Sequence, residues 1–206
     1  MIQKTTVNVW ISLLMIIVSL PTLAQDDFST SKSIKPLRIG VKVGLPNIIT
    51  ANAEYVTPLL SDRVAIAVDW MSLSQTIDDI NLNYNNFEIG SNIYLNTTGK
   101  GLYAGISYFS FDSEGTFPEV EFDNGAVEDG TGTVKFNTIN LKLGAKLGRT
   151  FYFRIEAGYG FGDIPEFIVV TSKTSSETTL EEIPGFPGIK TSGIPNFNFG
   201  IGFSFL

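Results

Sequence analysis

Apolar and polar residues alternate along most of the chain after residue 35, as they do in β-strands with two different faces. The last eleven residues, 196–206, show the pattern most clearly: five large apolar side chains alternate with asparagine, glycine and serine. Successive side chains of an extended strand point to opposite faces. Each such segment therefore has one large apolar face and one small or polar face.

Eight segments carry this pattern, and the sequence after residue 35 has no segment of helical periodicity. In the first segment the odd positions are apolar, whereas the even positions include Arg38 and Lys42. The second is the weakest, and Pro58 indicates that it ends there. The predicted strands are 37–45, 51–60, 64–70, 83–95, 102–108, 139–147, 151–159 and 196–206.

The predicted connections alternate in length. Those after the second, fourth and sixth strands are short, and the others are longer, with two very long loops at 112–133 and 162–193. Short turns on one rim and long loops on the other are typical of an up-and-down barrel in a bacterial outer membrane. The sequence therefore predicts an all-β fold over residues 36–206, an eight-stranded antiparallel up-and-down transmembrane β-barrel.

Alternation alone does not say which face meets water. A secreted barrel of lipocalin type, with its apolar face turned inward around a lipid, is the alternative. The membrane interpretation is favoured because the apolar face carries no charge in any of the eight strands, as hydrocarbon requires. The polar face is rich in small residues that suit a narrow barrel interior. Aromatic residues also lie towards strand ends, where interfacial girdles occur: Trp70, Tyr108, Phe151, Tyr159 and Phe205.

In the membrane interpretation the charged residues of the polar face point into the lumen. Basic and acidic groups are nearly balanced there, and buried charges are tolerated when they are paired and hydrogen-bonded. We therefore expect a lumen filled by side chains, with a small-solute or ion pore lined by the basic groups as the alternative. The predicted lumen polar network is Arg38, Lys42, Glu54, Asp69, Glu88, Lys142, Lys146, Arg154 and Glu156.

The N-terminal residues have the pattern of an export signal. Lys4 is followed by an apolar run over 9–20, and Ala24 is a small residue suited to cleavage. The run is shorter than the ~20 residues that a spanning helix needs, although an uncleaved anchor is the alternative. We expect residues 1–24 to be a signal peptide and the polar, Ser/Thr-rich residues 25–35 to be a flexible periplasmic leader.

Composition narrows the possible functions. The formal net charge of −7 argues against a nucleic-acid partner, because phosphates would be repelled. The chain has neither histidine nor cysteine, which removes the Ser–His hydrolases and the usual ligands of zinc sites. We expect no enzyme and no cofactor. A hydrolase that relies on Glu156 or Asp69 alone is the alternative, but a lumen carboxylate beside a guanidinium is more typical of a structural pair.

Over residues 36–206 the chain resembles the small OmpA/OmpX-like outer-membrane β-barrels of Gram-negative bacteria, in particular the porin-family-like barrel domains common in Bacteroidota. The resemblance lies in the export signal, the eight alternating strands, the loop rhythm and the aromatic last strand. It implies a multi-pass protein of the cell outer membrane, inserted by the barrel-assembly machinery and in contact with membrane lipid and lipopolysaccharide. The family's assembly signal corresponds here to Phe197, Phe199, Phe203 and Phe205, although this chain ends at Leu206 where the family ends in Phe.

The two long loops are the candidate interaction sites. The first is acidic, and Asp123, Glu128 and Asp129 are weak candidates for a divalent cation, whereas a solvated acidic loop is the simpler alternative. The second has strand character at 167–171 and a rigid Pro184–Gly188 segment, which together favour a projecting hairpin. We expect a structural or surface-interaction role, with a possible partner at either loop.

Overall fold

The computed structural model describes residues 34–77, 80–182 and 190–205. The predicted signal peptide, leader residues 25–33, the Pro184–Gly188 segment and Leu206 lie outside these residues. All regular structure in the described part is β-strand, so the all-β prediction is confirmed. No helix among the described residues is long and apolar enough to cross a membrane.

The structure has ten strands, where the sequence predicted eight. The difference lies in one hairpin, β8–β9, within the predicted second long loop. The strands are β1 (Leu37–Leu45), β2 (Ile48–Val56), β3 (Val64–Ile77), β4 (Ile80–Tyr94), β5 (Gly101–Glu121), β6 (Val127–Gly148), β7 (Phe151–Phe161), β8 (Phe167–Ser172), β9 (Thr178–Glu182) and β10 (Gly193–Phe205).

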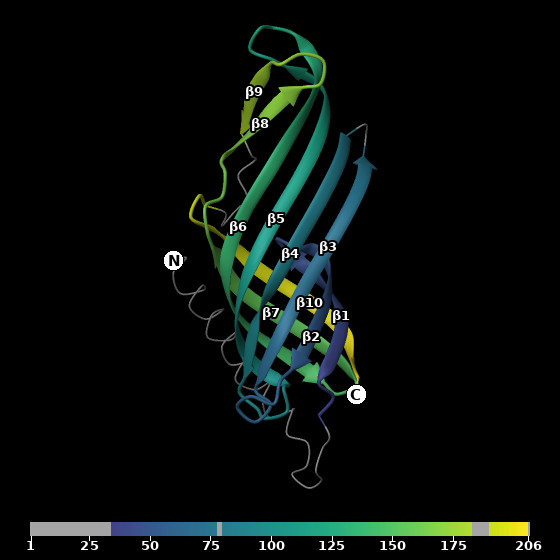
Figure 1. The fold of residues 1–206 in the computed structure, drawn as a ribbon, viewed down its shortest axis with the longest axis vertical. Coiled ribbons are helices and arrows are strands. Elements are labelled where there is room, and N and C mark those ends of the chain that lie inside the picture. The colour runs from purple at the N-terminus through teal and green to yellow at the C-terminus, as the bar shows by residue number, and fades with distance from the viewer. Residues whose placement is uncertain (1–33, 78–79, 183–189, 206) are drawn as a thin grey trace, which may run out of the picture.

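All the strands belong to one antiparallel sheet that closes into a ring. The hydrogen-bonded order runs β5-β4-β3-β2-β1-β10-β7-β6, and β5 also pairs with β6 (Figure 1). Strand β8 pairs with β6 at Gly130–Gly132, and β9 pairs with β8, so this hairpin lies beyond the ring at the distal end of β6. The C-terminus and the turns 57–63, 95–100 and 149–150 lie at the opposite end, the C-terminal rim.

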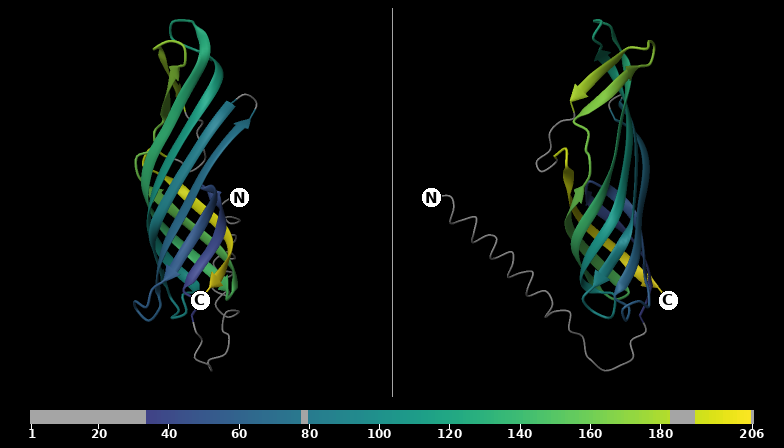
Figure 2. Two further views of the ribbon diagram at one scale, coloured as in Figure 1. Left: turned by 45° about the vertical axis from the view of Figure 1, so that its right-hand side comes forward. Right: turned by 60° about the vertical axis from the view of Figure 1, so that its left-hand side comes forward.

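The first predicted long loop is mostly strand, so that prediction was wrong. Strands β5 and β6 remain paired from Gly101↔Lys146 as far as Phe117↔Gly130, and only 122–126 form the turn between them. Strands β3 and β4 likewise continue as a pair to Ile77↔Ile80. These extensions form a curved sheet that projects beyond the ring (Figures 1 and 2).

The predicted alternation of link lengths was also wrong. The first link, predicted to be longer, consists of residues 46–47 alone, whereas the second, predicted to be short, runs from 57 to 63. At the far end the residues expected to form long loops instead extend the paired strands β3–β4 and β5–β6. Backbone pairing satisfies the peptide groups of these residues, and it needs no apolar face.

The two faces of the ring differ sharply in chemistry. In β10 the side chains of Phe197, Phe199, Ile201, Phe203 and Phe205 are 44–52 % exposed, whereas the alternating residues between them are buried inside. The same alternation holds in β1 and β7. The outside of the ring is therefore apolar, and its interior is polar and charged.

Apolar side chains are buried in two clusters, one towards each end of this polar interior. The cluster at the C-terminal rim consists of Val56, Ala65, Tyr94 and Tyr103. The cluster at the far end, the aromatic cap, consists of Phe109, Phe136, Ile164 and Ile194, with Phe111 and Val134 packed against them. The rings of Phe111 and Phe136 stack with centroids 4.7 Å apart.

Candidate functional site: the charged interior of the ring

The structure places all nine residues of the predicted lumen polar network inside the ring. Their side chains come from six different strands, and each residue is only 1–6 % exposed. Each of the nine forms an ion pair with at least one other member. The register of the sheet therefore brings together groups that the sequence could assign only to a common face.

Glu54 on β2 is the centre of the first group of charges. Its carboxylate accepts hydrogen bonds from Arg38 Nη1 and Arg154 Nη2, each at 2.5 Å, and Lys146 Nζ lies 3.5 Å away. Tyr94 Oη donates to Glu54 Oε1 at 2.9 Å. One carboxylate therefore serves three cations, and a buried carboxylate is stabilised by this number of donors.

The second group has the opposite balance of charge. Lys42 pairs with both Asp69 and Glu156, with Nζ 3.0 Å from Glu156 Oε2. Lys142 donates to Glu88 Oε1 at 2.6 Å. Two lysines here face three carboxylates, whereas three cations face one carboxylate around Glu54. The interior as a whole is nearly neutral but is positive towards the C-terminal rim.

Tyrosine rings complete the network, although the sequence alone indicates no role for them beyond filling the inner face with hydrogen-bonding groups. Lys146 Nζ lies 5.5 Å from the ring centroid of Tyr94 and 5.0 Å from that of Tyr152. Tyr103 Oη donates to Glu156 Oε1 at 2.6 Å. Aromatic faces attract cations, so these rings hold positive charge in a place with few acids. For Tyr152 and Tyr94 a signal was present in the sequence, because they lie an even number of residues from Arg154 and Glu88 on the inner faces of β7 and β4.

All four carboxylates of the network form ion pairs with cations of the protein itself. Asp69 and Glu156, the residues considered for a carboxylate-only hydrolase, both pair with Lys42 and are only 1–2 % exposed. A general base needs to reach the proton that it abstracts from a substrate. In this geometry Asp69 contacts the ammonium group of Lys42 and the amide of Asn52, and Glu156 contacts Lys42 and the hydroxyl of Tyr103.

The acidic segment is arranged differently from a cation site. Glu128 accepts hydrogen bonds from Ser172 and from Ser175 Oγ, the latter at 3.1 Å, and the bond from Ser172 lowers the pKa of this carboxyl. The other two candidates, Asp123 and Asp129, do not join it in a ligand cluster. Across the described residues no group of three His, Cys, Asp or Glu side chains could hold a metal ion. Glu128 instead ties the β8–β9 hairpin to β6.

The predicted assembly-signal residues Phe197, Phe199, Phe203 and Phe205 all lie on the outer face of β10. This strand pairs with β7 on one side and with β1 on the other. The pairing of β10 with β1 therefore joins the last strand to the first and closes the ring. The comparisons with known proteins give no family: no family model matches the sequence, and no curated protein matches it.

Proposed function

We propose that this protein is an integral outer-membrane β-barrel in which the eight ring strands span the bilayer. It is non-enzymatic, its lumen is filled by side chains, and its role is structural or surface-interacting. The observation that carries the proposal is a reversal of the arrangement usual in soluble proteins: large apolar side chains lie outside the ring, and nine charged residues are buried within it.

This reversal has a simple physical rationale in a bilayer. Soluble monomers rarely expose an apolar patch larger than a few hundred Å². Here, exposed Ile, Val, Leu and Phe side chains lie along the outer face of the ring strands. Lipid removes them from water, and a closed ring leaves no unpaired strand edge in the hydrocarbon. The lipocalin-type alternative needs an apolar interior, which is the opposite arrangement.

The filled interior favours a closed barrel over a pore. The basic groups that would line a pore are engaged in ion pairs, and the aromatic cap lies across the far end of the lumen. A ring of about eight strands is just wide enough for side chains to fill. A small-solute or ion pore remains the second candidate, and conductance distinguishes the two.

The extended sheet is the element that we assign to surface interaction. It projects from the end opposite the C-terminus, built from the distal parts of β3–β6 and the β8–β9 hairpin (Figure 2). In the described part of the chain, β9 pairs with β8 alone and 72–77 of β3 pair with β4 alone. Open edges of this kind can accept a strand from a partner. Export by residues 1–24 and insertion by the barrel-assembly machinery complete the proposal.

Fractionation combined with surface proteolysis tests this proposal. We expect the protein in the detergent-soluble outer membrane, with heat-modifiable migration on gels. Proteolysis of intact cells should cleave only in the projecting sheet, including the turn 122–126, and in 162–193. Recovery in the soluble periplasm would refute the membrane assignment. In planar bilayers the purified protein should give no stable single-channel currents, and large steady currents would favour the pore instead.

A further inference from the structure

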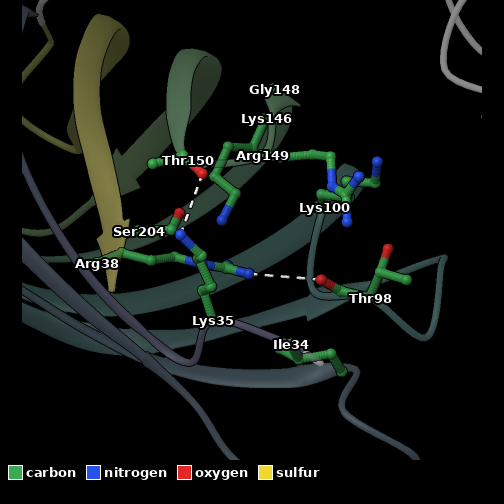
Figure 3. A pocket seen from close by; sticks show the side chains of 10 residues that line it. All are labelled: Ile34, Lys35, Arg38, Thr98, Lys100, Lys146, Gly148, Arg149, Thr150 and Ser204. Carbon is green, nitrogen blue, oxygen red and sulfur yellow. Dashed lines mark hydrogen bonds between the residues drawn. The ribbon is translucent and has the colours of Figure 1, made fainter. Parts of the chain in front are cut away.

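A basic pocket opens at the C-terminal rim of the ring. Its volume is about 220 Å³, larger than the ~150 Å³ of an engineered cavity that holds benzene. Figure 3 shows the side chains around it, with Lys35 Nζ bonded to Thr150 Oγ1 at 3.1 Å and Arg38 Nη2 bonded to the carbonyl of Thr98 at 3.5 Å. Five of the lining residues are cations: Lys35, Arg38, Lys100, Lys146 and Arg149.

The protein neutralises this charge only in part with its own acids. Among the described residues that line the pocket none is acidic, although the whole chain has a net charge of −7. Glu54, which does not line the pocket, pairs with Arg38 and Lys146 and is shared with Arg154. Lys100 and Arg149 form no ion pair within the described part. The rim end of the interior therefore carries an excess of positive charge.

Two of the five cations are held in place by the surrounding fold, because Arg38 and Lys146 are only 3 % and 2 % exposed. The hydroxyl-bearing residues Thr98, Thr150 and Ser204 also line the pocket and supply further neutral donors.

We propose that this pocket binds a phosphate group. Guanidinium groups match the oxygens of phosphate in geometry, and lysine ammonium groups add point charge. The non-bridging oxygens of a phosphate group point in different directions, so one group can contact several of these cations at once. The group comes either from a free phosphate compound or from the headgroup of an anionic phospholipid at the rim.

The pocket is independent of the proposed membrane location. It is defined by the rim turns 95–100 and 149–150 together with the start of β1, whatever surrounds the ring. If fractionation refuted the membrane assignment, phosphate binding by the folded protein would still test the pocket. The two proposals therefore fail on different measurements.

The test uses the folded full chain in a non-ionic maltoside detergent. Calorimetric titration with inorganic phosphate reports the free compound, and native mass spectrometry after exposure to phosphatidylglycerol reports retained lipid. The test variant is Lys100→Ala with Arg149→Ala, because neither side chain takes part in the interior network. Loss of each charged hydrogen bond should weaken binding about tenfold. The matched control is Arg63→Ala, an exposed arginine of the same rim that does not line the pocket.

Saturable phosphate binding that the double variant weakens and Arg63→Ala leaves unchanged supports the pocket with a free phosphate as its ligand. Retention of phosphatidylglycerol with the same dependence supports it with a lipid headgroup. The proposal is overturned if neither probe binds, if the double variant binds as the wild type does, or if Arg63→Ala weakens binding equally.

Discussion

Replacing Glu54 with glutamine tests whether the interior is held together by charge pairing. Arg38 and Lys146 have no other ion-pair partner among the described residues, whereas Arg154 keeps Glu156 at 3.8 Å. Glutamine has nearly the same size and shape as glutamate, so the change opens no cavity. It leaves two buried cations without a negative partner.

The expected loss of stability follows from the number of cations left without a partner. Removing one partner of a buried ion pair typically costs ~3–5 kcal/mol, because the remaining charge is left uncompensated away from water. Two cations are stranded by this single change, so we expect a loss in the unfolding free energy of about 4 kcal/mol or more. A domain of ordinary stability has about 5–15 kcal/mol in total, so the variant should be close to unfolding.

Urea unfolding of the protein in phospholipid vesicles gives the free energy, followed by fluorescence and by heat-modifiable migration on gels. Glu166→Gln is the matched control, because Glu166 is exposed. Its effect should stay within about 0.5 kcal/mol. Combining Glu54→Gln with Arg38→Met should restore part of the lost stability, since the double variant removes one stranded cation.

Two outcomes would refute this reasoning. A cost below about 1 kcal/mol for Glu54→Gln would mean that water or the tyrosine rings already compensate the cations. A double variant less stable than Glu54→Gln would mean that Arg38 contributes through packing rather than through its charge.

Two further predictions concern the outer face and the hairpin. Ile201 is 44 % exposed on β10. If lipid surrounds this side chain, Ile201→Arg should lower the unfolding free energy in vesicles by ~2–4 kcal/mol, whereas the change should be near zero if water surrounds it. The control Leu180→Arg on β9 should leave the unfolding free energy unchanged. The bond from Ser172 holds the pKa of the Glu128 carboxyl below its usual range. The stabilising contribution is therefore present above the ordinary glutamate pKa and is lost as the pH falls through the lowered value. The protection factors of the β8 amides, which are exchange rates corrected for the slower intrinsic exchange at low pH, should fall on acidification, and Glu128→Gln should abolish this dependence; an unchanged dependence would contradict it.

The sequence located the strands of the ring well where one face had to be apolar. The predicted 37–45 coincides with β1, and 151–159 lies within β7. The reason is that a period of two in side-chain direction is a property of the extended backbone itself. It can be read without knowing what the strand pairs with.

Strand ends were not readable in this way. Residues 112–121 and 127–133 are polar or mixed on both faces, so the alternation is weak there, yet they pair in register up to Phe117↔Gly130. Their extension depends on a partner strand that offers the complementary hydrogen bonds. The β8–β9 hairpin was expected from its short apolar run, but its docking on Gly130–Gly132 was not.

The sequence by itself determined two chemically different faces and a near-balanced set of nine charges on one of them. Only the closed ring decided that this face lies inside, and which cation meets which acid. Arg154 reaches Glu54 across 100 residues of chain because β7 and β2 face each other across the interior. Spacing along a strand fixes the direction of a side chain, whereas its partners depend on the register of every strand between them.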